Sequence, residues 1–428
     1  MALIDLSLWL EEFSGPGWII FAKRLSGNDT LANATHQAGP YIPKALLFEV
    51  IPGINRPDAL NPEASLDLSI DSHSDRRRVR AIWYNNKLFG RTRDEARITN
   101  FGGRSSPLLD PDSTGALAIF AFRVIAGAGA PDCHVWVARD PIEEDLMEDR
   151  IGPVEPGRSV VHRAGSPRLA FILAPERRSC WLSPKEMPAR WAAAFPSGAV
   201  IARKSVELRP SPGLSPDARL LKRLECEYEV FRSVEHAVEL PAILAGFATV
   251  DDFLVKAQTI LQRRKSRAGR SLELQTREIF IEERLREGVD FAHQPESEPG
   301  KRPDFLFPSQ AAYRNPRYPV AGLRMLAVKT TCKDRWRQVI NEADRIRAKH
   351  LLTLQNGVSE AQFQEMSAAG VQLVIPAGNI ASFPKAVRPR LQTLEDFIAE
   401  LRRLNPAGGK AAESGEGGNS SRSNRNLP

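Results

Sequence analysis

The sequence predicts two domains of different fold class, an all-β N-terminal domain and an α/β C-terminal domain with a mixed sheet flanked by helices. Runs of branched and aromatic residues, separated by Gly and Pro, fill the first half of the chain. Apolar residues recur at helical spacing from about residue 217. Short apolar runs then alternate with helical segments, which is typical of a sheet covered by helices.

The composition is that of a globular protein with room for two to three domains, since 42% of the 428 residues are hydrophobic. The net charge of +7 favours a polyanionic partner but is small for this length. The N-terminus lacks a secretory pattern, and no apolar run of about 18 residues could span a membrane, so we expect a cytoplasmic protein. The four cysteines show no Cys-x-x-Cys spacing, so we do not expect a zinc ribbon. We expect reduced thiols at Cys133, Cys180, Cys226 and Cys332.

The first domain is placed at 1–181 and interpreted as a compact barrel or sandwich. The stretch 76–90 alternates around an Asn-Asn pair, as a β-hairpin does, with its arginines turned to solvent. Two runs at 115–127 and 133–140 are apolar and bounded by Gly, Pro or Asp, which predicts two further strands.

Pro, Ser and Gly are frequent at 182–216, which we interpret as a linker. The second domain is placed at 217–403, followed by a disordered tail at 404–428. It begins with three predicted helices, of which Asp217 and Ser271 are the expected N-caps of the first and third, at 217–240, 249–269 and 271–288. Strands are expected at 304–307, 323–329, 350–354 and 371–376, and helices at 334–349 and 359–370.

Several charged residues stand at the starts and ends of these predicted strands and on the helices beside them. Asp304 opens one predicted strand, and Lys329 ends the next, 25 residues later. Neighbouring strands would bring the two together, and Glu342 on the next helix would point into the same notch. Glu273, on the preceding helix, could complete the group. Carboxylates suit Mg²⁺, and a lysine can stabilise charge on a phosphate, so this set fits metal-assisted phosphodiester hydrolysis.

A structural interpretation stays open, in which these charged residues only cap strands or face solvent. The residues that follow favour chemistry on DNA, because Lys333 and Arg335 can pair with guanine edges and Asp334 can accept from cytosine N4. The alternative for this triplet is a solvated helix start with Asp334 as its N-cap.

Six stretches carry a family resemblance: "KRLSGNDT" (23–30), "HQAGPYIP" (36–43), "DPDSTGALAIFAF" (110–122), "RRKSRAGRSLEL" (263–274), "RPDFLFP" (302–308) and "LRMLAVKTTCKDRWRQVINEAD" (323–344). In these residues the chain resembles the EcoRII-type (type IIE) restriction endonucleases of the PD-(D/E)xK superfamily. The resemblance implies a restriction-endonuclease-like C-terminal domain. It also implies an N-terminal DNA-binding pseudobarrel, similar to the plant B3 type, that represses the nuclease.

The resemblance further implies a homodimer that cleaves double-stranded DNA at 5′-CCWGG with Mg²⁺ and needs a second site as effector. Two alternatives stay open, a nuclease of the same fold with another target and a catalytically inert, sequence-specific DNA-binding regulator.

The resemblance implies that the catalytic residues are Glu273, Asp304, Lys329, Glu342 and Lys333. It also implies that the three acids among them hold the metal. Ala327 stands where the usual motif has an acid, two residues before Lys329. One branch of the family displaces that acid to the position that Glu342 takes here, 13 residues after the lysine. The residues implied to read the outer C·G pairs are Lys333, Asp334 and Arg335.

Relatives flip the central base pair and hold each base between an arginine and an aromatic ring one helical turn on. Tyr228 is the candidate ring here. Leu224 stands four residues before it, so Arg223, five residues before, is the candidate arginine. The alternative is that Tyr228 belongs to a helix core.

In the N-terminal domain, the residues implied to contact effector DNA are His36, Tyr41, Arg91, Arg93, Glu95 and Arg97. The three arginines form a basic cluster after a hairpin strand, suited to phosphates or guanines. A solvated charged loop would have the same composition. Ala96 stands where a relative has a basic residue, which removes one phosphate contact.

Overall fold

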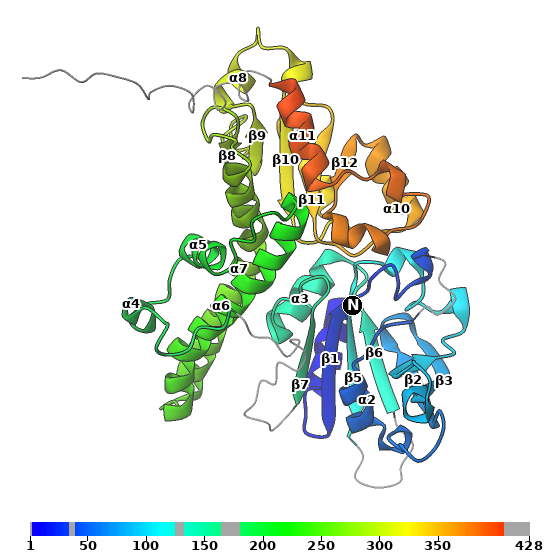
Figure 1. The fold of residues 1–428 in the computed structure, drawn as a ribbon. Coiled ribbons are helices and arrows are strands. Elements are labelled where there is room, and N and C mark those ends of the chain that lie inside the picture. The colour runs from blue at the N-terminus through cyan, green and yellow to red at the C-terminus, as the bar shows by residue number, and fades with distance from the viewer. Residues whose placement is uncertain (1, 34–38, 125–131, 164–179, 406–428) are drawn as a thin grey trace, which may run out of the picture.

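The computed structural model describes residues 2–33, 39–124, 132–163 and 180–405, which form two domains in contact with each other (Figure 1). The predicted tail lies outside these residues from position 406 onward, and His36 also lies outside them. Within the described ranges, no helix has the length and apolar character that crossing a membrane requires.

The N-terminal domain is built on a curled sheet of seven strands, in the spatial order β4-β3-β2-β6-β5-β1-β7. The strands are β1 (Trp18–Arg24), β2 (Glu63–Ile70), β3 (Asp75–Tyr84), β4 (Glu95–Thr99), β5 (Leu117–Arg123), β6 (Asp132–Val137) and β7 (Ser159–Arg163). Its helices are α1 (Ala2–Glu12), α2 (Lys44–Val50) and α3 (Pro141–Ile151). Only β2 and β6 pair in parallel among these neighbours of the described sheet, and the predicted β pseudobarrel is confirmed.

Alternating apolar residues give this sheet two buried faces. Phe21 and Phe120 belong to the core inside the curl, while Leu6 of α1 and Met147 of α3 cover the other face. The predicted strands at 115–127 and 133–140 appear as β5 and β6. The hairpin predicted at 76–90 is only half right, because β3 forms its first strand but Asn86–Phe89 form a 3-10 helix, and β3 pairs with β4 further along the chain.

The C-terminal domain has a mixed five-stranded sheet in the order β12-β11-β10-β9-β8, which confirms the predicted fold class. The strands are β8 (Ala292–His293), β9 (Phe305–Phe307), β10 (Arg324–Lys329), β11 (Lys349–Thr353) and β12 (Val371–Val374). The helices are α4 (Ala189–Ala193), α5 (Gly198–Leu208), α6 (Pro216–Ala245), α7 (Val250–Glu282), α8 (Gln310–Arg314), α9 (Trp336–Ile340), α10 (Glu360–Ala368) and α11 (Leu394–Leu404).

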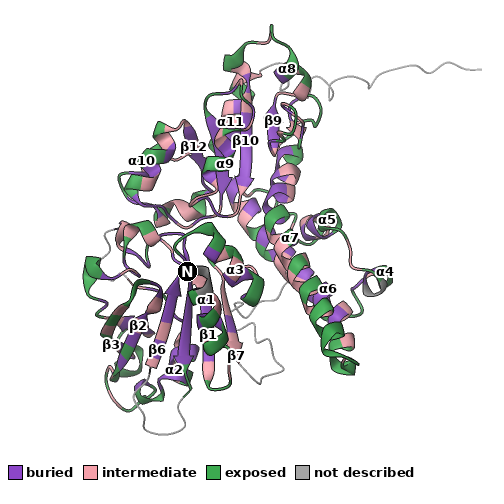
Figure 2. Ribbon diagram, turned by 180° about the vertical axis from the view of Figure 1, so that it is seen from behind, coloured by how far each residue is buried: buried purple, intermediate pink, exposed green. Residues whose placement is uncertain are grey.

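Two helical layers cover this sheet, whose strands are buried on both sides (Figure 2). Phe280 of α7 and Phe397 of α11 pack with Leu326 and Val328 on one face. Trp336 of α9 and Phe363 of α10 share a core with residues such as Met325 on the other. β10 is the central strand and alternates its side chains between these cores, and Lys329, its last residue, lies partly exposed at one end of the sheet.

Three local predictions are wrong. The second and third predicted helices are one helix, α7, so Ser271 lies inside it and donates to Glu227 Oε2 at 2.8 Å instead of capping an end. Ser215 caps α6, while Asp217 accepts backbone N–H groups of residues 377, 394 and 395. The helix expected at 334–349 stops after α9, at Ile340, so Glu342 stands in a turn.

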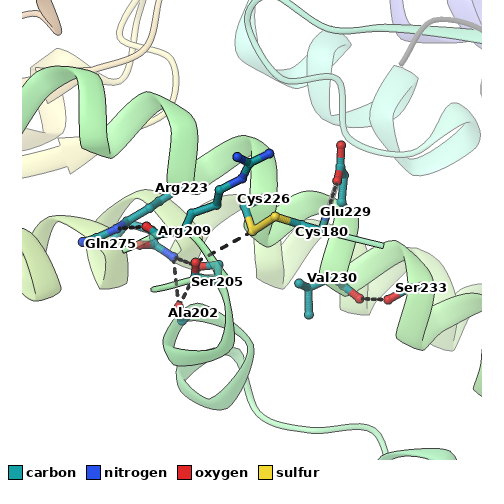
Figure 3. Close-up of a disulfide and its surroundings, with 10 residues drawn as sticks. All are labelled: Cys180, Ala202, Ser205, Arg209, Arg223, Cys226, Glu229, Val230, Ser233 and Gln275. Atoms are coloured by element: carbon teal, nitrogen blue, oxygen red, sulfur yellow. Dashed lines mark hydrogen bonds between the residues drawn. A yellow bond between two sulfur atoms is a disulfide. The ribbon is translucent and has the colours of Figure 1, made fainter. Parts of the chain in front are cut away.

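The segment predicted as a linker is partly helical and packs onto the C-terminal domain. It contains α4 and α5, and Trp191 and Ile201 share a core with Phe231 of α6. Figure 3 shows Cys180 joined to Cys226 of α6 by a disulfide across 46 residues. The expectation of four reduced thiols is therefore wrong for this pair, because sequence spacing does not show which cysteines packing brings together. Cys133 and Cys332 are free and buried.

Candidate active site

Asp304 and Lys329 meet at one end of the C-terminal sheet. β9 and β10 run antiparallel, with Phe305 opposite Leu326, so the residue before β9 lies beside the end of β10. Oδ2 of Asp304 accepts the Val328 backbone N–H at 2.7 Å and the Lys329 ammonium at 3.2 Å. The sheet register therefore holds the carboxylate and the lysine together without help from a loop.

Two further acids face this pair from other elements. Glu342, in the turn after α9, interacts electrostatically with both Asp304 and Lys329. Its Oε2 atom is buried and has no hydrogen-bond partner among the described residues. Glu273 lies on α7, 5% exposed, with Oε1 at 2.5 Å from Nε2 of His293 and accepting from the side-chain amide of Gln294 at 2.7 Å.

Burial raises the pKa values of two carboxyl groups at this site. Burial raises the pKa of Asp304, Lys329 opposes the rise, and the charge of Glu273 adds to it. Burial also raises the pKa of Glu342 to about 7, where the charge of Asp304 adds to the rise and nearby lysines oppose it. Acids with raised pKa values gathered at one point are typical of catalytic and metal-binding sites.

The residues fit a Mg²⁺ ion in the chemistry of their donor atoms. Mg²⁺ is commonly bound through one or two carboxylates and keeps several waters, so Asp304 and Glu342 suffice. The unpartnered Oε2 of Glu342 is an oxygen that a cation would satisfy. No set of three His, Cys, Asp or Glu side chains is arranged as a metal cage in the described chain. Glu273 is therefore not assembled with the other two acids into such a cage.

The triplet at 333–335 lies on the loop between β10 and α9, next to the acidic group. Its side chains are partly exposed. Gln355 Oε1 accepts the backbone N–H of Cys332 at 2.8 Å and of Lys333 at 3.0 Å, which holds the start of the loop. α9 has Arg335 at its N-cap position and no side-chain cap, so Asp334 is not the N-cap. The guanidinium of Arg335 lies 3.9 Å from Asp145 of the N-terminal domain.

Tyr228 of α6 has its ring beside guanidinium groups from both domains. Arg158, on the segment before β7, lies 3.8 Å from the ring centroid, and Arg267 of α7 lies 4.8 Å from it. Arg223 is fully buried elsewhere, where it forms an ion pair with Glu282 at 2.7 Å. Arg223 therefore does not hold a base against this ring in the described arrangement, whereas Arg267 of the same domain lies beside it.

The N-terminal domain has a hollow of about 260 Å³, lined by Gly39, Pro40, Tyr41, Arg80, Tyr84, Arg93, Arg97, Ile98, Thr99 and Asn100. Glu95 lies between Arg93 at 2.5 Å and Arg97 at 2.9 Å. The Arg93 guanidinium stacks 3.7 Å above the Tyr84 ring. Three of the predicted contacts, Tyr41, Arg93 and Arg97, thus line one hollow, while Arg91 is exposed on the β3–β4 connection.

Comparison with known proteins identifies the family. Residues 14–166 match the family model "Restriction endonuclease EcoRII, N-terminal", and residues 231–398 match "EcoRII C terminal". The type II restriction enzyme EcoRII of Escherichia coli is 43% identical over 400 residues, which cover 92% of this chain and 97% of that protein. This chain belongs to the EcoRII family. It is a type II restriction endonuclease, an enzyme that cuts DNA at specific sites.

Two solved structures are similar to parts of this EcoRII-family enzyme. Metal-depleted Ecl18kI in complex with uncleaved, modified DNA is 20% identical, with a TM-score of 0.41, over 53% of this chain and 86% of that chain. The B3 domain of the UbaLAI restriction endonuclease, with cognate DNA, is 21% identical, with a TM-score of 0.25, over 38% of this chain and 99% of that chain.

Sequence reasoning missed several residues that the fold of this EcoRII-family enzyme brings to these sites. They are His293 and Gln294 beside Glu273, Arg158 and Arg267 beside Tyr228, and Arg80 and Tyr84 in the N-terminal hollow. Only the basic, alternating strand at 76–84 carried a sequence signal for any of them. The others come from elements distant in the chain, and no local pattern marks them.

Proposed function

We propose that this EcoRII-family enzyme acts in the cytoplasm as a Mg²⁺-dependent homodimer that hydrolyses double-stranded DNA at 5′-CCWGG. The observation that carries the proposal is the convergence of Asp304, Lys329 and Glu342 at one end of the sheet, beside its central strand, with both carboxyl pKa values raised. The proposed effector domain is 1–181 and the catalytic domain 217–403, with 182–216 attached to the latter through α4 and α5.

In the proposed reaction, the carboxylates of Asp304 and Glu342 would hold the Mg²⁺ ion. The bound ion would polarise the scissile phosphate and supply an activated water. Lys329, 3.2 Å from Asp304, orients the water or stabilises the negative charge that develops on the phosphate. Glu273, fixed by His293 and Gln294, adds negative charge on the α7 side of the site.

For recognition, we assign the outer C·G pairs to Lys333, Asp334 and Arg335. Their loop directly follows the strand that ends in Lys329, so base contacts and the scissile phosphate would lie close together. Gln355 supports this assignment because it binds two consecutive backbone N–H groups at the start of the loop. We assign the effector site to the N-terminal hollow and its rim, with contacts from Tyr41, Arg91, Arg93, Glu95 and Arg97. His36, outside the described residues, stays a proposed DNA contact by resemblance.

Autoinhibition by the N-terminal domain is supported by what this domain contacts. Arg158 covers a face of Tyr228, where a flipped base would stack. Asp145 and Asp149 of α3 lie 3.4 and 3.2 Å from Lys265 of α7, and Asp145 lies 3.9 Å from Arg335. The acidic residues of α3 thus neutralise cations that DNA phosphates or bases would otherwise bind. We infer that binding of effector DNA must separate these contacts before the substrate can enter.

The test is incubation of purified protein with Mg²⁺ and a plasmid that carries several CCWGG sites, alongside the same plasmid without them. Discrete fragments with ends at CCWGG are the expected result. Fragments with other ends would keep the nuclease but replace the target, and binding without cutting would indicate an inert DNA-binding regulator.

A further inference from the structure

Lys349 is a buried lysine that the proposed hydrolysis does not use. It is the first residue of β11, and only 4% of it is exposed. Its Nζ donates to the backbone carbonyl oxygen of Glu342 at 2.5 Å and to that of Ala343 at 2.7 Å. Because burying an ammonium is costly unless polar groups compensate it, this pair of carbonyls is where the lysine is stabilised.

The turn that carries Glu342 is held by its own backbone, where the Glu342 N–H donates to the Val339 carbonyl at 3.2 Å, and also by side chains from outside it. Ala343 has φ of +49°, in the left-handed region that residues with a Cβ atom rarely adopt. Backbone N–H groups further along the turn donate to Glu298 and to the hydroxyl of Tyr313, both at 3.1 Å. These contacts hold the far half of the turn, whereas Lys349 holds the half where Glu342 stands.

We propose that Lys349 is a positioning residue for catalysis, which holds the backbone at residues 342 and 343 so that the Glu342 carboxylate faces Asp304 and Lys329. The inference rests on the proposed function. It follows from the state of the carboxylate itself, whose buried Oε2 has no hydrogen-bond partner among the described residues. Without a bond at that oxygen, the direction of the side chain depends on its backbone, and Lys349 is the side chain that binds this backbone directly at residue 342.

Lys301 offers a control, since it is another lysine that contacts the same turn. Its Nζ lies 2.7 Å from Asp344, two residues after Glu342, and its side chain is 35% exposed. Loss of this ion pair removes a lysine contact to the turn but leaves the carbonyls of 342 and 343 bound. A role of Lys349 confined to stability would make the two lysines differ only in melting temperature.

The experiment compares Lys349→Met with Lys301→Met in the full-length protein. Methionine keeps most of the length of the side chain and removes the ammonium. We expect Lys349→Met to lower cleavage of CCWGG plasmid 10- to 100-fold at fixed Mg²⁺, the range for residues that orient a metal ligand. We also expect it to abolish most of the rise in melting temperature that Mg²⁺ causes without DNA. Lys301→Met should stay within about twofold of wild type in both, by the same criterion.

A double-mutant cycle separates positioning from stability. If Lys349 acts through Glu342, Lys349→Met should change cleavage little further in a Glu342→Gln background. An equal loss in both backgrounds would overturn the proposal, as would a normal Mg²⁺-induced rise in melting temperature for Lys349→Met. If Lys349→Met does not fold, Lys349→Arg replaces it, because it keeps the charge but displaces the donors, and the same two outcomes decide. Failure of the wild type to cut would refute the proposed function, while the Mg²⁺-induced rise would still decide the role of Lys349.

Discussion

Two groups of buried acids in the C-terminal domain differ in how their charges are satisfied. On the α6–α7 hairpin, Glu235 accepts two bonds from Arg264 at 2.7 Å, and Glu239 lies between Lys256 at 3.1 Å and Arg263 at 2.5 Å. At the end of the sheet where Lys329 lies, Glu342 has a buried oxygen with no hydrogen-bond partner in the described chain. The charges of the first group are paired within the domain, whereas the second leaves a buried carboxylate oxygen without a hydrogen bond among the described residues.

The pKa values of Glu239 and Glu342 are shifted in opposite directions. Burial raises the pKa of Glu239, but the bonds from Arg263 and Lys256 outweigh it, and the pKa is lowered overall. Burial dominates at Glu342 and raises its pKa to about 7. The comparison teaches that burial alone does not mark a site, since a buried acid becomes a candidate ligand when its partners are missing.

The largest effect is expected at the lysine that ends β10. Lys329→Ala removes the ammonium beside Asp304 and should lower cleavage by about 1000-fold, as the loss of one stabilising group of a transition state does. DNA binding in Ca²⁺, measured by gel shift, should remain. Near-normal cleavage would show that Asp304, Lys329 and Glu342 do not form the active site.

Glu342→Gln should lower cleavage by about 100-fold, since it removes one of two proposed ligands. It should also change how stability depends on pH without metal. A raised carboxyl pKa means that the folded protein holds its proton longer than the unfolded chain, so wild-type stability falls between pH 4.5 and about 7. The variant lacks this fall and should be more stable by roughly 3 kcal/mol at pH 8.

Urea unfolding with EDTA at pH 5, 6 and 8 measures this difference, and Mg²⁺ should narrow it at pH 8 by binding to the wild type. Parallel stability profiles for the two proteins would show that Glu342 ionises normally, which would remove the contrast with Glu239.

Arg158→Ala tests whether the α6–α7 hairpin, whose acids are paired, also takes part in regulation through Tyr228 of α6. The change exposes the Tyr228 ring that the N-terminal domain covers, and we expect cleavage of one-site DNA to rise by roughly tenfold, within the range of coupling between sites. Rates on one-site and two-site plasmids are compared. A matched change at Arg150 of α3, which lies 3.8 Å from Glu11 of the same domain, should leave the ratio unaltered. An unchanged ratio for Arg158→Ala as well would argue that this contact does not inhibit.

The smallest effect on cleavage is expected from Glu239→Gln, within about twofold, because no proposed ligand contacts it. Its cost should appear in stability instead, at roughly 1–3 kcal/mol, since Lys256 and Arg263 lose their charged partner. Because the pKa of Glu239 is lowered, this contribution should be lost from the wild type as pH falls through the acid range. A loss of activity as large as that of Glu342→Gln would erase the distinction between the two groups.

The sequence by itself determined the class of each domain and much of the candidate site. Strand periodicity and Gly and Pro placement predict β5 and β6, and the alternation of apolar runs with helical segments predicts the mixed sheet. Asp304 and Lys329 flank adjacent strands, so their approach follows from a register that only needs those strands to pair. These features are local, and local backbone preferences and burial periodicity are sufficient to specify them.

Tertiary structure alone decided the remainder. The turn that carries Glu342 stands where a helix was predicted, and its backbone is bound by Glu298 and Tyr313 from distant elements and by Lys349 at the start of β11. The same holds for the arginines beside Tyr228, since Arg158 comes from the other domain. Partner choice among buried charges depends on which elements pack together. One-dimensional spacing contains no record of that packing, so it could name the acids but could not tell which of them would remain unpaired.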